Sequence, residues 1–438
     1  MRYRQAAYSP DAVLARMLDS VRAQAGSDSL SLVLNGDVFD FDAPRVINGE
    51  SQFHDQPRTE HNAVAMLAAI LDDHPVFVDA LGRVVADGHE LVVISGNHDA
   101  QLVFPGVREL LAERVIEAAL KALTTREEAA PGLAALRERV VFRAWFHRTR
   151  DGILIEHGNQ YDEYCALRYP MAPFGHSPDE VQPTLGSLAS RNLLSRMGYF
   201  NPHVDSSFML SLFGYLSHWA RYYLFSRRSL AFAWMMGAIR TVATLIRSRH
   251  AGSRTERSCN VAAATQETGT PRKIIARHAR LFARPSEDRL LRVARELWLD
   301  RFALSALVLV IATLWLTFAH GPLLYGVAVA PMMLLGYELA MPKPTLDDNW
   351  REVQANARKI ARIHKAKAVV LGHTHRESGV WENGTFFGNC GSWSAAYRDI
   401  ECTQPLNDRR PLVWLRSDVD GQMQGGLVYW VHDRDFLH

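Results

Sequence analysis

Val369-Val370-Leu371-Gly372-His373-Thr374-His375-Arg376 has the pattern of a short buried β-strand that runs into a turn with two histidines. Residues two apart on an extended chain point to the same side, so His373 and His375 are predicted to reach toward one place. Neutral imidazole is the commonest metal-ligating side chain. The case for a metal site is stronger because three other stretches, far away in the sequence, also carry polar side chains just past a predicted strand.

In each of those stretches the polar residue stands one to three positions beyond a predicted strand end: Asp37 after residues 30–34, Asn97 after 91–94 and His157 after 152–156. Amphipathic helices are predicted around them, at about 11–25, 64–71, 76–86 and 107–123. Strands that alternate with helices indicate an α/β fold whose sheet has parallel members. The polar site of such a sheet lies beyond the carboxyl ends of its strands, so all four side chains are predicted to converge there.

With 438 residues, 48% of them apolar and 22% charged, the chain has the composition of a folded protein of one to three domains. Its four cysteines are scattered without a C-x-x-C pair, which argues against a disulfide framework or a zinc ribbon. The net charge of +2 hides an asymmetry: residues 187–301 hold 19 Lys/Arg and 7 Asp/Glu, a net of +12, so the remainder carries −10. A basic middle segment favours an anionic membrane surface as partner, and the simpler alternative is a solvated basic face. No nucleic acid is expected as a defined partner.

The pattern changes between residues 187 and 344. Residues 208–246 combine aromatic and aliphatic side chains with arginines, which suits helices at a membrane interface, and the polar residues 251–270 predict a loop. Residues 302–319 contain no charge, and a second apolar stretch, 323–337, follows the break at His320-Gly321-Pro322. Each half is near the lower limit of a membrane span, and Arg and Lys flank only the outer ends. We therefore predict a membrane hairpin at 302–341, with a pair of buried helices in a soluble insertion as the alternative.

These patterns divide the chain into a first core segment (1–186), a basic and apolar helical insertion (187–344) and a second core segment (345–438). The last contains a predicted helix at 350–364 and a β-rich tail. If all four motifs serve one site, both flanks of the insertion must lie on one side of a membrane, which a hairpin allows and a single span does not. The predicted location is the cytoplasmic membrane with the core on the cytoplasmic side, and the alternative is the cytoplasm.

A carboxylate, an amide oxygen and three imidazoles, from Asp37, Asn97, His157, His373 and His375, make a mixed O/N donor set. Such a set suits Mn, Fe, Zn, Co or Ni, and argues against Cu(I) or an Fe–S cluster. Two such ions about 3.5–4 Å apart clamp a phosphoryl group and activate water. Divalent ions, Mn, Fe or Zn, are the predicted cofactors, and one carboxylate can bridge two of them.

Other residues of the same motifs have candidate roles beside the metal ligands. His98 is the candidate to protonate a leaving oxygen or stabilise negative charge. Asp40 and Asp99 are candidates to orient imidazoles from behind. Arg376 and Tyr161 stand near ligands in the sequence and are candidates to contact phosphate.

Four motifs in order, Gly36-Asp37-x-x-Asp40, Gly96-Asn97-His98-Asp99, His157 and Gly372-His373-x-His375, resemble the signature of the calcineurin-like metallophosphoesterase superfamily. The resemblance covers about residues 30–162 and 347–393, and four ordered motifs together are highly specific. It implies a sandwich of two β-sheets flanked by helices, a dinuclear metal centre and hydrolysis of phosphoesters or pyrophosphates. It also implies that Asp37 bridges the ions, that Asn97, His157 and His373 complete one site, that His375 serves the other, and that His98 is the catalytic histidine.

One departure concerns the second metal site. The family opens with an Asp-x-His on its first strand, and both residues bind the metal that His375 also binds, yet no Asp-x-His precedes Asp37. We expect that the printed sequence lacks that first strand, and the alternative is a natural chain with one impaired site. Either way, the chain is predicted to bind one metal ion well and the second poorly.

The leading functional hypothesis is a membrane-associated, metal-dependent phosphohydrolase with an amphiphilic substrate such as a phospholipid or a lipid-linked pyrophosphate. The segment 152–162 is similar to the corresponding one in UDP-diacylglucosamine pyrophosphatases, but the insertion is longer and differently patterned, so that substrate is not carried over. Two alternatives are a phosphohydrolase of soluble substrates with a membrane anchor and a catalytically impaired metal-binding scaffold.

Overall fold

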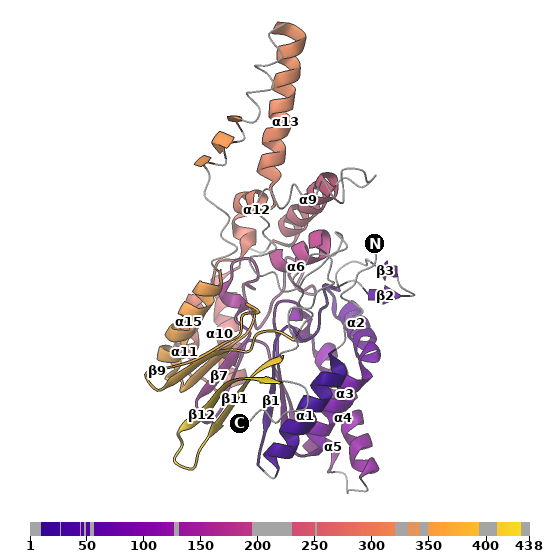
Figure 1. The fold of residues 1–438 in the computed structure, drawn as a ribbon, viewed down its shortest axis with the longest axis vertical. Helices are drawn as coiled ribbons and strands as arrows, with labels where there is room; N and C mark the ends of the chain where they lie inside the picture. Colours follow the sequence, from indigo (N-terminus) through magenta and orange to yellow (C-terminus); the bar gives the residue numbers. More distant parts are fainter. Residues whose placement is uncertain are drawn as a thin grey trace.

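A computed structural model of the chain describes residues 10–26, 28–43, 45–47, 50–52, 57–126, 131–194, 230–249, 252–319, 332–333, 335–337, 339–340, 349–393 and 410–430. It has the mixed α/β class that the sequence predicts, with open sheets (Figure 1). The strands are β1 (Ser31–Asn35), β2 (Arg45–Ile47), β3 (Glu50–Gln52), β4 (Glu90–Ile94), β5 (Val140–Arg143), β6 (Phe146–Arg148), β7 (Ile153–Glu156), β8 (Ala368–Leu371), β9 (Ser378–Glu382), β10 (Thr385–Asn389), β11 (Arg410–Ser417) and β12 (Met423–Trp430).

The first half of the chain forms a parallel three-stranded sheet in the order β1-β4-β5. A layer of helices covers it: α1 (Asp11–Ala25), α2 (Glu60–Asp73), α3 (Pro75–Ala86), α4 (Pro105–Thr125) and α5 (Leu133–Glu138). The predicted spacing of apolar residues is visible in α1, where Met17, Leu18 and Val21 are buried in the hydrophobic core between this sheet and its helices. The three strands end at one edge, which carries the first two candidate motifs.

The second sheet has five strands in the order β6-β7-β8-β10-β9. Its central strands β7 and β8 are parallel neighbours although about 210 residues separate them in the sequence, so the long segment between them is inserted between paired strands. Along β8, Val369 and Leu371 face the helical cluster on one side, while Ala368 and Val370 face the β11–β12 hairpin on the other. This alternation buries β8 on both faces. The turn with His373 and His375 follows directly after the strand.

Part of the inserted segment belongs to the core of this sheet. Helices α10 (Arg254–Thr268) and α11 (Arg272–His278) pack with α15 (Asn349–His364) over the five-stranded sheet, burying Val261, Ala264 and Ile275. The prediction of a loop at 251–270 is therefore wrong. Ser253 caps α10 by accepting a hydrogen bond from the Glu256 N–H, and Gly269 ends it in the left-handed conformation. The polar face of α10 is exposed and its apolar face has few residues, so the polar composition of the segment predicted a loop. The cap residues at its two ends are the local signals for a helix.

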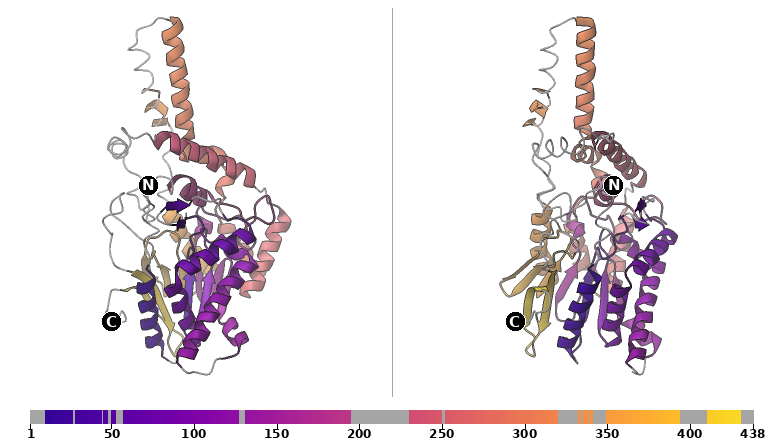
Figure 2. Two further views of the ribbon diagram at one scale, coloured as in Figure 1. Left: turned by 90° about the vertical axis from the view of Figure 1, so that its right-hand side faces the viewer. Right: turned by 45° about the vertical axis from the view of Figure 1, so that its right-hand side comes forward.

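The other described helices of the insertion lie at the end of the molecule where the parallel strands terminate (Figures 1 and 2). Helix α6 (Leu185–Ala189) packs on α9 (Leu230–Ser248), and α9 packs on α12 (Leu290–Glu296) and α13 (Leu299–Leu314). Figure 1 shows α13 projecting away from the sheets. Its exposed apolar side chains include Leu307, Leu309, Val310, Ile311 and Leu314, and the turn that follows it adds Trp315 and Phe318.

Among the described residues, no single helix is long and apolar enough to cross a membrane. Helices α12 and α13 satisfy length and composition only as a pair, and they are bent by 73° at their junction. The break of the predicted hairpin, at 320–322, and its last residue, 341, lie outside the described residues, as do residues 323–331 and 195–229. The hairpin therefore stays a prediction.

Candidate metal centre

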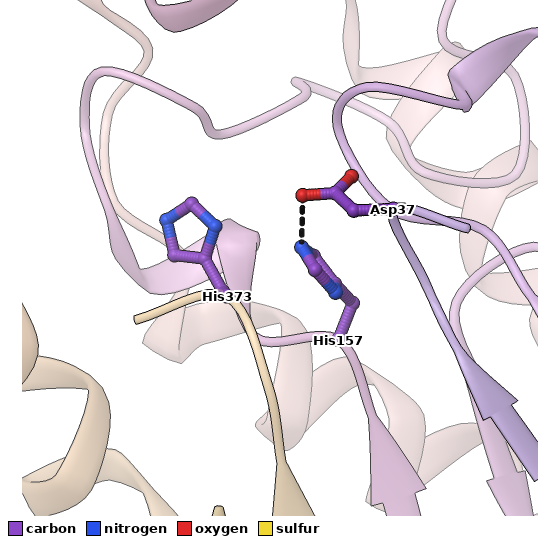
Figure 3. A group of neighbouring side chains, drawn as sticks. All are labelled: Asp37, His157 and His373. Atoms are coloured by element: carbon purple, nitrogen blue, oxygen red, sulfur yellow. Dashed lines mark ion pairs between the residues drawn. The ribbon is translucent and has the colours of Figure 1, made fainter. Parts of the chain in front are cut away.

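Four loops at the strand ends build the site, one each after β1, β4, β7 and β8. Asp37, His157 and His373 are brought together, with one ligand atom from each lying within 4.8 Å of the others (Figure 3). Asn97 stands in the adjoining loop, whose His98 backbone N–H donates to Asp37 Oδ1 at 2.7 Å. The convergence predicted from strand ends is thus present for these three ligands, and Asn97 lies next to them.

Three buried atoms of these residues have no hydrogen-bond partner: Asn97 Oδ1, His157 Nε2 and His373 Nδ1. His157 Nε2 lies 2.9 Å from Asp37 Oδ2, but the atoms are not aligned as a hydrogen bond. Its other ring nitrogen, Nδ1, is 2.9 Å from the Asn35 carbonyl oxygen. Buried polar atoms are rarely left unpaired, and these three are all lone-pair donors suited to a divalent ion. The residues therefore fit a metal site.

Backbone conformation and close packing position the ligands. Asp37, His373 and His375 have φ angles of 52°, 65° and 56°, in the left-handed region that residues other than glycine seldom adopt. Gly36 and Gly96 are required for close approach, because a Cβ at Gly36 would lie 2.6 Å from His157 Cγ and one at Gly96 would lie 2.6 Å from the Asp37 nitrogen. Such conformations cost roughly 1–3 kcal/mol each and tend to occur at functional sites.

The electrostatics of the site keep Asp37 ionised. Burial alone would raise the pKa of Asp37, but the His157 and His98 imidazoles hold that pKa well below its usual range. The pKa of Asp99 is instead raised to about 6, first by burial and then by the negative charge of Asp37. Burial lowers the pKa of His157, but Asp37 raises it above its ordinary value. Metal binding requires the ionised carboxylate and a neutral imidazole, so an ion would take the place of the His157 proton.

Asp42 is a functional candidate that sequence reasoning missed. Its carboxylate Oδ2 is 2.8 Å from His98 Nδ1, and the residue is 2% exposed. Asp40, predicted for this role, lies 3.7 Å from the same nitrogen and accepts hydrogen bonds from the Asp42 and Ala43 backbone N–H groups. Burial lowers the pKa of His98, but Asp37, Asp42 and Asp40 together raise it well above its ordinary value. The Asp40-Phe41-Asp42 repeat was the only sequence signal for this contact.

Asp99 has a different environment from the one predicted. Its carboxylate accepts hydrogen bonds from the Gly96 N–H at 2.6 Å and the Val38 N–H at 2.8 Å. Asp99 therefore joins the loops that carry Asp37 and Asn97. Its hydrogen bonds within the described part of the chain come from backbone N–H groups, so Asp99 positions the ligands through the backbone and makes no hydrogen bond with an imidazole there.

Tyr161 lies in the protein core. It is 1% exposed, and its hydroxyl donates to Glu156 Oε1 at 2.6 Å and lies 2.7 Å from His278 Nε2. This placement argues against the phosphate contact predicted from the sequence. Arg376 is half-buried in the turn after β8, directly after His375, so its phosphate contact stays a prediction.

His375 joins no candidate metal group in the part of the chain that the structure describes. Two further groups of close ligand atoms do occur there, Asp162–Cys165–His373 and Asp40–Asp42–His98. The first shares His373 with the main group, and Asp162 Oδ2 is 3.0 Å from His373 Nε2. Asp162 is thus a second residue at the site that the sequence reasoning did not single out.

Comparison with protein-family models, with curated proteins and with solved structures finds no match to this chain. The family resemblance consequently rests on the four ordered motifs alone.

Proposed function

We propose that this protein is a metal-dependent hydrolase of phosphoesters or pyrophosphates, of the calcineurin-like metallophosphoesterase kind with its helix-flanked β-sandwich. One observation carries the proposal: Asp37, His157 and His373 offer ligand atoms within 4.8 Å of one another, and Asn97 Oδ1, His157 Nε2 and His373 Nδ1 are buried without a hydrogen-bond partner. These residues come from the loops in which the family holds its metal, and most buried polar atoms of folded proteins do have a hydrogen-bond partner.

Asp37, Asn97, His157 and His373 would hold the ion, and Mn, Fe and Zn are the metals that this donor set suits. An ion there supplies Lewis acidity toward a phosphoryl oxygen and favours ionisation of water. The protein itself fixes the ligands: the Asn35 carbonyl orients His157, and the His98 backbone N–H orients Asp37. These contacts use His157 Nδ1 and Asp37 Oδ1, which leaves His157 Nε2 and Asp37 Oδ2 for the ion.

His98 would act as the general acid. Asp42 engages Nδ1, which leaves Nε2 as the nitrogen to donate a proton to a leaving oxygen. Burial lowers the pKa of His98, but the negative charges of Asp37, Asp42 and Asp40 raise it well above its ordinary value, which favours the protonated imidazole. A raised pKa is what an acid at this position needs.

Action at a membrane is supported by the arrangement of the insertion. The loops of the site contact α6, since the Ser187 hydroxyl lies 3.4 Å from the Asn97 carbonyl oxygen, and α6 packs on α9, which packs on the exposed apolar helix α13. The site therefore lies at the end of the body from which α13 projects (Figure 1). We propose the cytoplasmic membrane face as the location and an amphiphilic phosphate as the substrate. A soluble substrate, with α13 only as an anchor, is the second candidate.

The first experiment measures metal content and hydrolysis together. The purified full chain is loaded with Mn²⁺ or Zn²⁺, and a water-soluble aryl phosphodiester is the probe. We expect one tightly held ion per chain, activity that Asp37→Ala removes together with the ion, and activity that His98→Ala removes while the ion stays. Two tightly held ions would refute the predicted stoichiometry. Metal binding without hydrolysis of aryl, nucleotide or lipid phosphates would favour the impaired scaffold.

The second experiment tests the membrane. Leu309→Gln with Phe318→Gln removes one exposed apolar side chain of α13 and one from the turn directly after it. Leu133→Gln with Val419→Gln is the matched control, because both are exposed apolar residues of the two core segments. Burial of each side chain contributes about 1.5 kcal/mol or more, so the α13 variant should bind vesicles with 30% phosphatidylglycerol roughly 100-fold more weakly than the control. Equal partitioning of the two variants would contradict membrane docking through α13.

A further inference from the structure

Asp162 contacts the candidate ligand His373 on the side opposite its unpaired nitrogen. Asp162 Oδ2 is 3.0 Å from His373 Nε2, and Asp162 is only 8% exposed. His373 Nδ1 is buried and has no hydrogen-bond partner. The two ring nitrogens therefore have different surroundings, one facing a carboxylate and the other facing Asp37 and His157 (Figure 3).

A neutral imidazole has one N–H and one lone pair, whereas an ionised carboxylate can only accept. The hydrogen bond to Asp162 consequently requires the proton on Nε2 and leaves the lone pair on Nδ1. Nδ1 is the ring nitrogen on the side of Asp37 and His157 (Figure 3), so the Asp162 contact sets the tautomer that a metal ion there needs. The same hydrogen bond restricts rotation of the ring. The backbone of His373, with a φ of 65°, sets where the side chain starts.

Asp162 itself is held in place from two directions. Its Oδ1 accepts a hydrogen bond from the Tyr164 N–H at 2.9 Å. The next residue, Glu163, forms ion pairs with Arg289 at 2.9 Å and Arg292 at 2.8 Å, and both arginines precede α13 in the insertion. The Glu163 carbonyl also accepts from the Ser286 N–H at 2.9 Å. Asp162 thus stands on a loop that the insertion braces.

We propose that Asp162 is a positioning residue for the metal centre: it fixes the tautomer and direction of His373 so that Nδ1 is presented to the ion. The proposal rests on the proposed function only in requiring His373 as a metal ligand. Such carboxylate–histidine–metal arrangements raise ligand basicity, and their removal costs 10- to 100-fold in metal affinity.

Asp162→Asn is the decisive variant because it keeps size and reverses the direction of the proton. The Tyr164 N–H can only donate, so the amide oxygen of the new side chain must face it and the NH₂ must face His373 Nε2. The proton of His373 is then driven to Nδ1, and the lone pair is lost from the metal side. We expect Mn²⁺ affinity, measured by calorimetry on the full chain, to fall 10- to 100-fold.

Three further variants make the result interpretable. Glu163→Gln weakens the bracing of the same loop without touching His373, and should bind Mn²⁺ within about threefold of the wild type. Cys165→Ala should also leave the affinity unchanged, since burial first, and then Asp162 and Asp37, raise the pKa of the Cys165 thiol and disfavour it as a ligand. His373→Ala sets the floor that loss of the ligand produces.

A direct readout of the tautomer comes from imidazole ¹⁵N resonances of the metal-free protein, with His373 assigned by comparison with His373→Ala. The wild type should show the Nε2–H form and Asp162→Asn the Nδ1–H form. Unchanged Mn²⁺ affinity in Asp162→Asn, or an equal loss in Glu163→Gln, would overturn the proposal. So would a large loss in Cys165→Ala, which would place the ion between Asp162, Cys165 and His373. Weakened metal binding in a protein without phosphohydrolase activity would defeat the proposed function and leave this inference standing.

Discussion

Gly96→Ala should damage the metal centre while leaving the fold nearly intact. A Cβ at residue 96 would lie 2.6 Å from the Asp37 nitrogen and 2.9 Å from its Cγ, whereas ordinary contacts are 3.4–4 Å. The Asp37 loop must therefore move by about 1 Å. The N–H of residue 96 also donates to Asp99 Oδ1 at 2.6 Å, so the loop that carries the methyl group cannot simply retreat.

The expected magnitude follows from overpacking in a confined site. Inserting a methyl group where the neighbours cannot relax costs about 1–3 kcal/mol. With an unfolding entropy of ~2.1 cal/mol/K per residue, 2 kcal/mol lowers the melting temperature by only about 2 °C in a chain of this length. Metal affinity is the sharper readout, because a 1 Å shift of Asp37 breaks its 2.7 Å hydrogen bond from the His98 N–H and displaces a ligand atom. We expect Mn²⁺ affinity to fall at least tenfold.

Gly132→Ala is the matched control for this substitution. A Cβ at Gly132 would meet nothing within 4 Å, and its φ of −58° and ψ of 148° suit alanine. The control should be as stable as the wild type or slightly more stable, since alanine restricts the unfolded chain. Calorimetric Mn²⁺ titration at 20 °C, where both variants are folded, compares the two. Equal affinity and equal melting temperature of Gly96→Ala and Gly132→Ala would refute the reasoning.

Three more outcomes are expected. Asp42→Asn should lower kcat about 100-fold with Mn²⁺ affinity unchanged, and should move the alkaline limb of the kcat–pH profile to lower pH, because the Asp42 charge raises the pKa of His98; an unchanged profile would exclude Asp42 as the partner of the acid. Mn²⁺ at 100 times its Kd should raise the free energy of unfolding by about 2.7 kcal/mol, and should have no effect in Asp37→Ala. Burial, and then the neighbouring His278, lower the pKa of His364 to about 3, so the unfolded state takes up a proton below pH 6.5 that the folded state refuses. Between pH 6.5 and 5 the wild type should therefore lose about 2 kcal/mol more than His364→Leu in urea unfolding, and parallel losses would contradict a neutral buried His364.

The strand ends were predictable because the signal is local. A short apolar stretch followed within three residues by a ligand type is visible in the sequence at Asp37, Asn97, His157 and His373, and parallel pairing brings such positions to one edge. The mixed α/β class is confirmed, and it was predictable because the alternation of strands and helices is also a local signal. The helices α1, α3 and α4 were also predicted, because their apolar residues recur at helical spacing over three or more turns.

The contacts behind the ligands were not predictable, because they depend on how loops meet in space. Asp42 was passed over in favour of Asp40, and only the turn of the Asp40–Asp42 segment decides which carboxylate faces His98. Asp162 lies 211 positions from its partner His373. The polar composition of residues 251–270 predicts a loop, whereas the segment forms α10. Its Ser253 cap and its Gly269 terminus are the signals in the sequence that indicate a helix.

The pairing of β7 with β8 has a consequence for synthesis on the ribosome. The sheet β1-β4-β5 is complete once residue 143 has emerged, so it can form early with its helices. Strand β7 emerges soon afterwards, but its neighbour β8 follows about 210 residues later. At 5–20 residues per second, that interval is roughly 10–40 s. Throughout it the nascent chain holds the unpaired edge of β7, and the apolar helix α13 emerges before β8 does. The order of synthesis therefore exposes α13 before the second sheet, and with it His373, can complete the candidate metal centre.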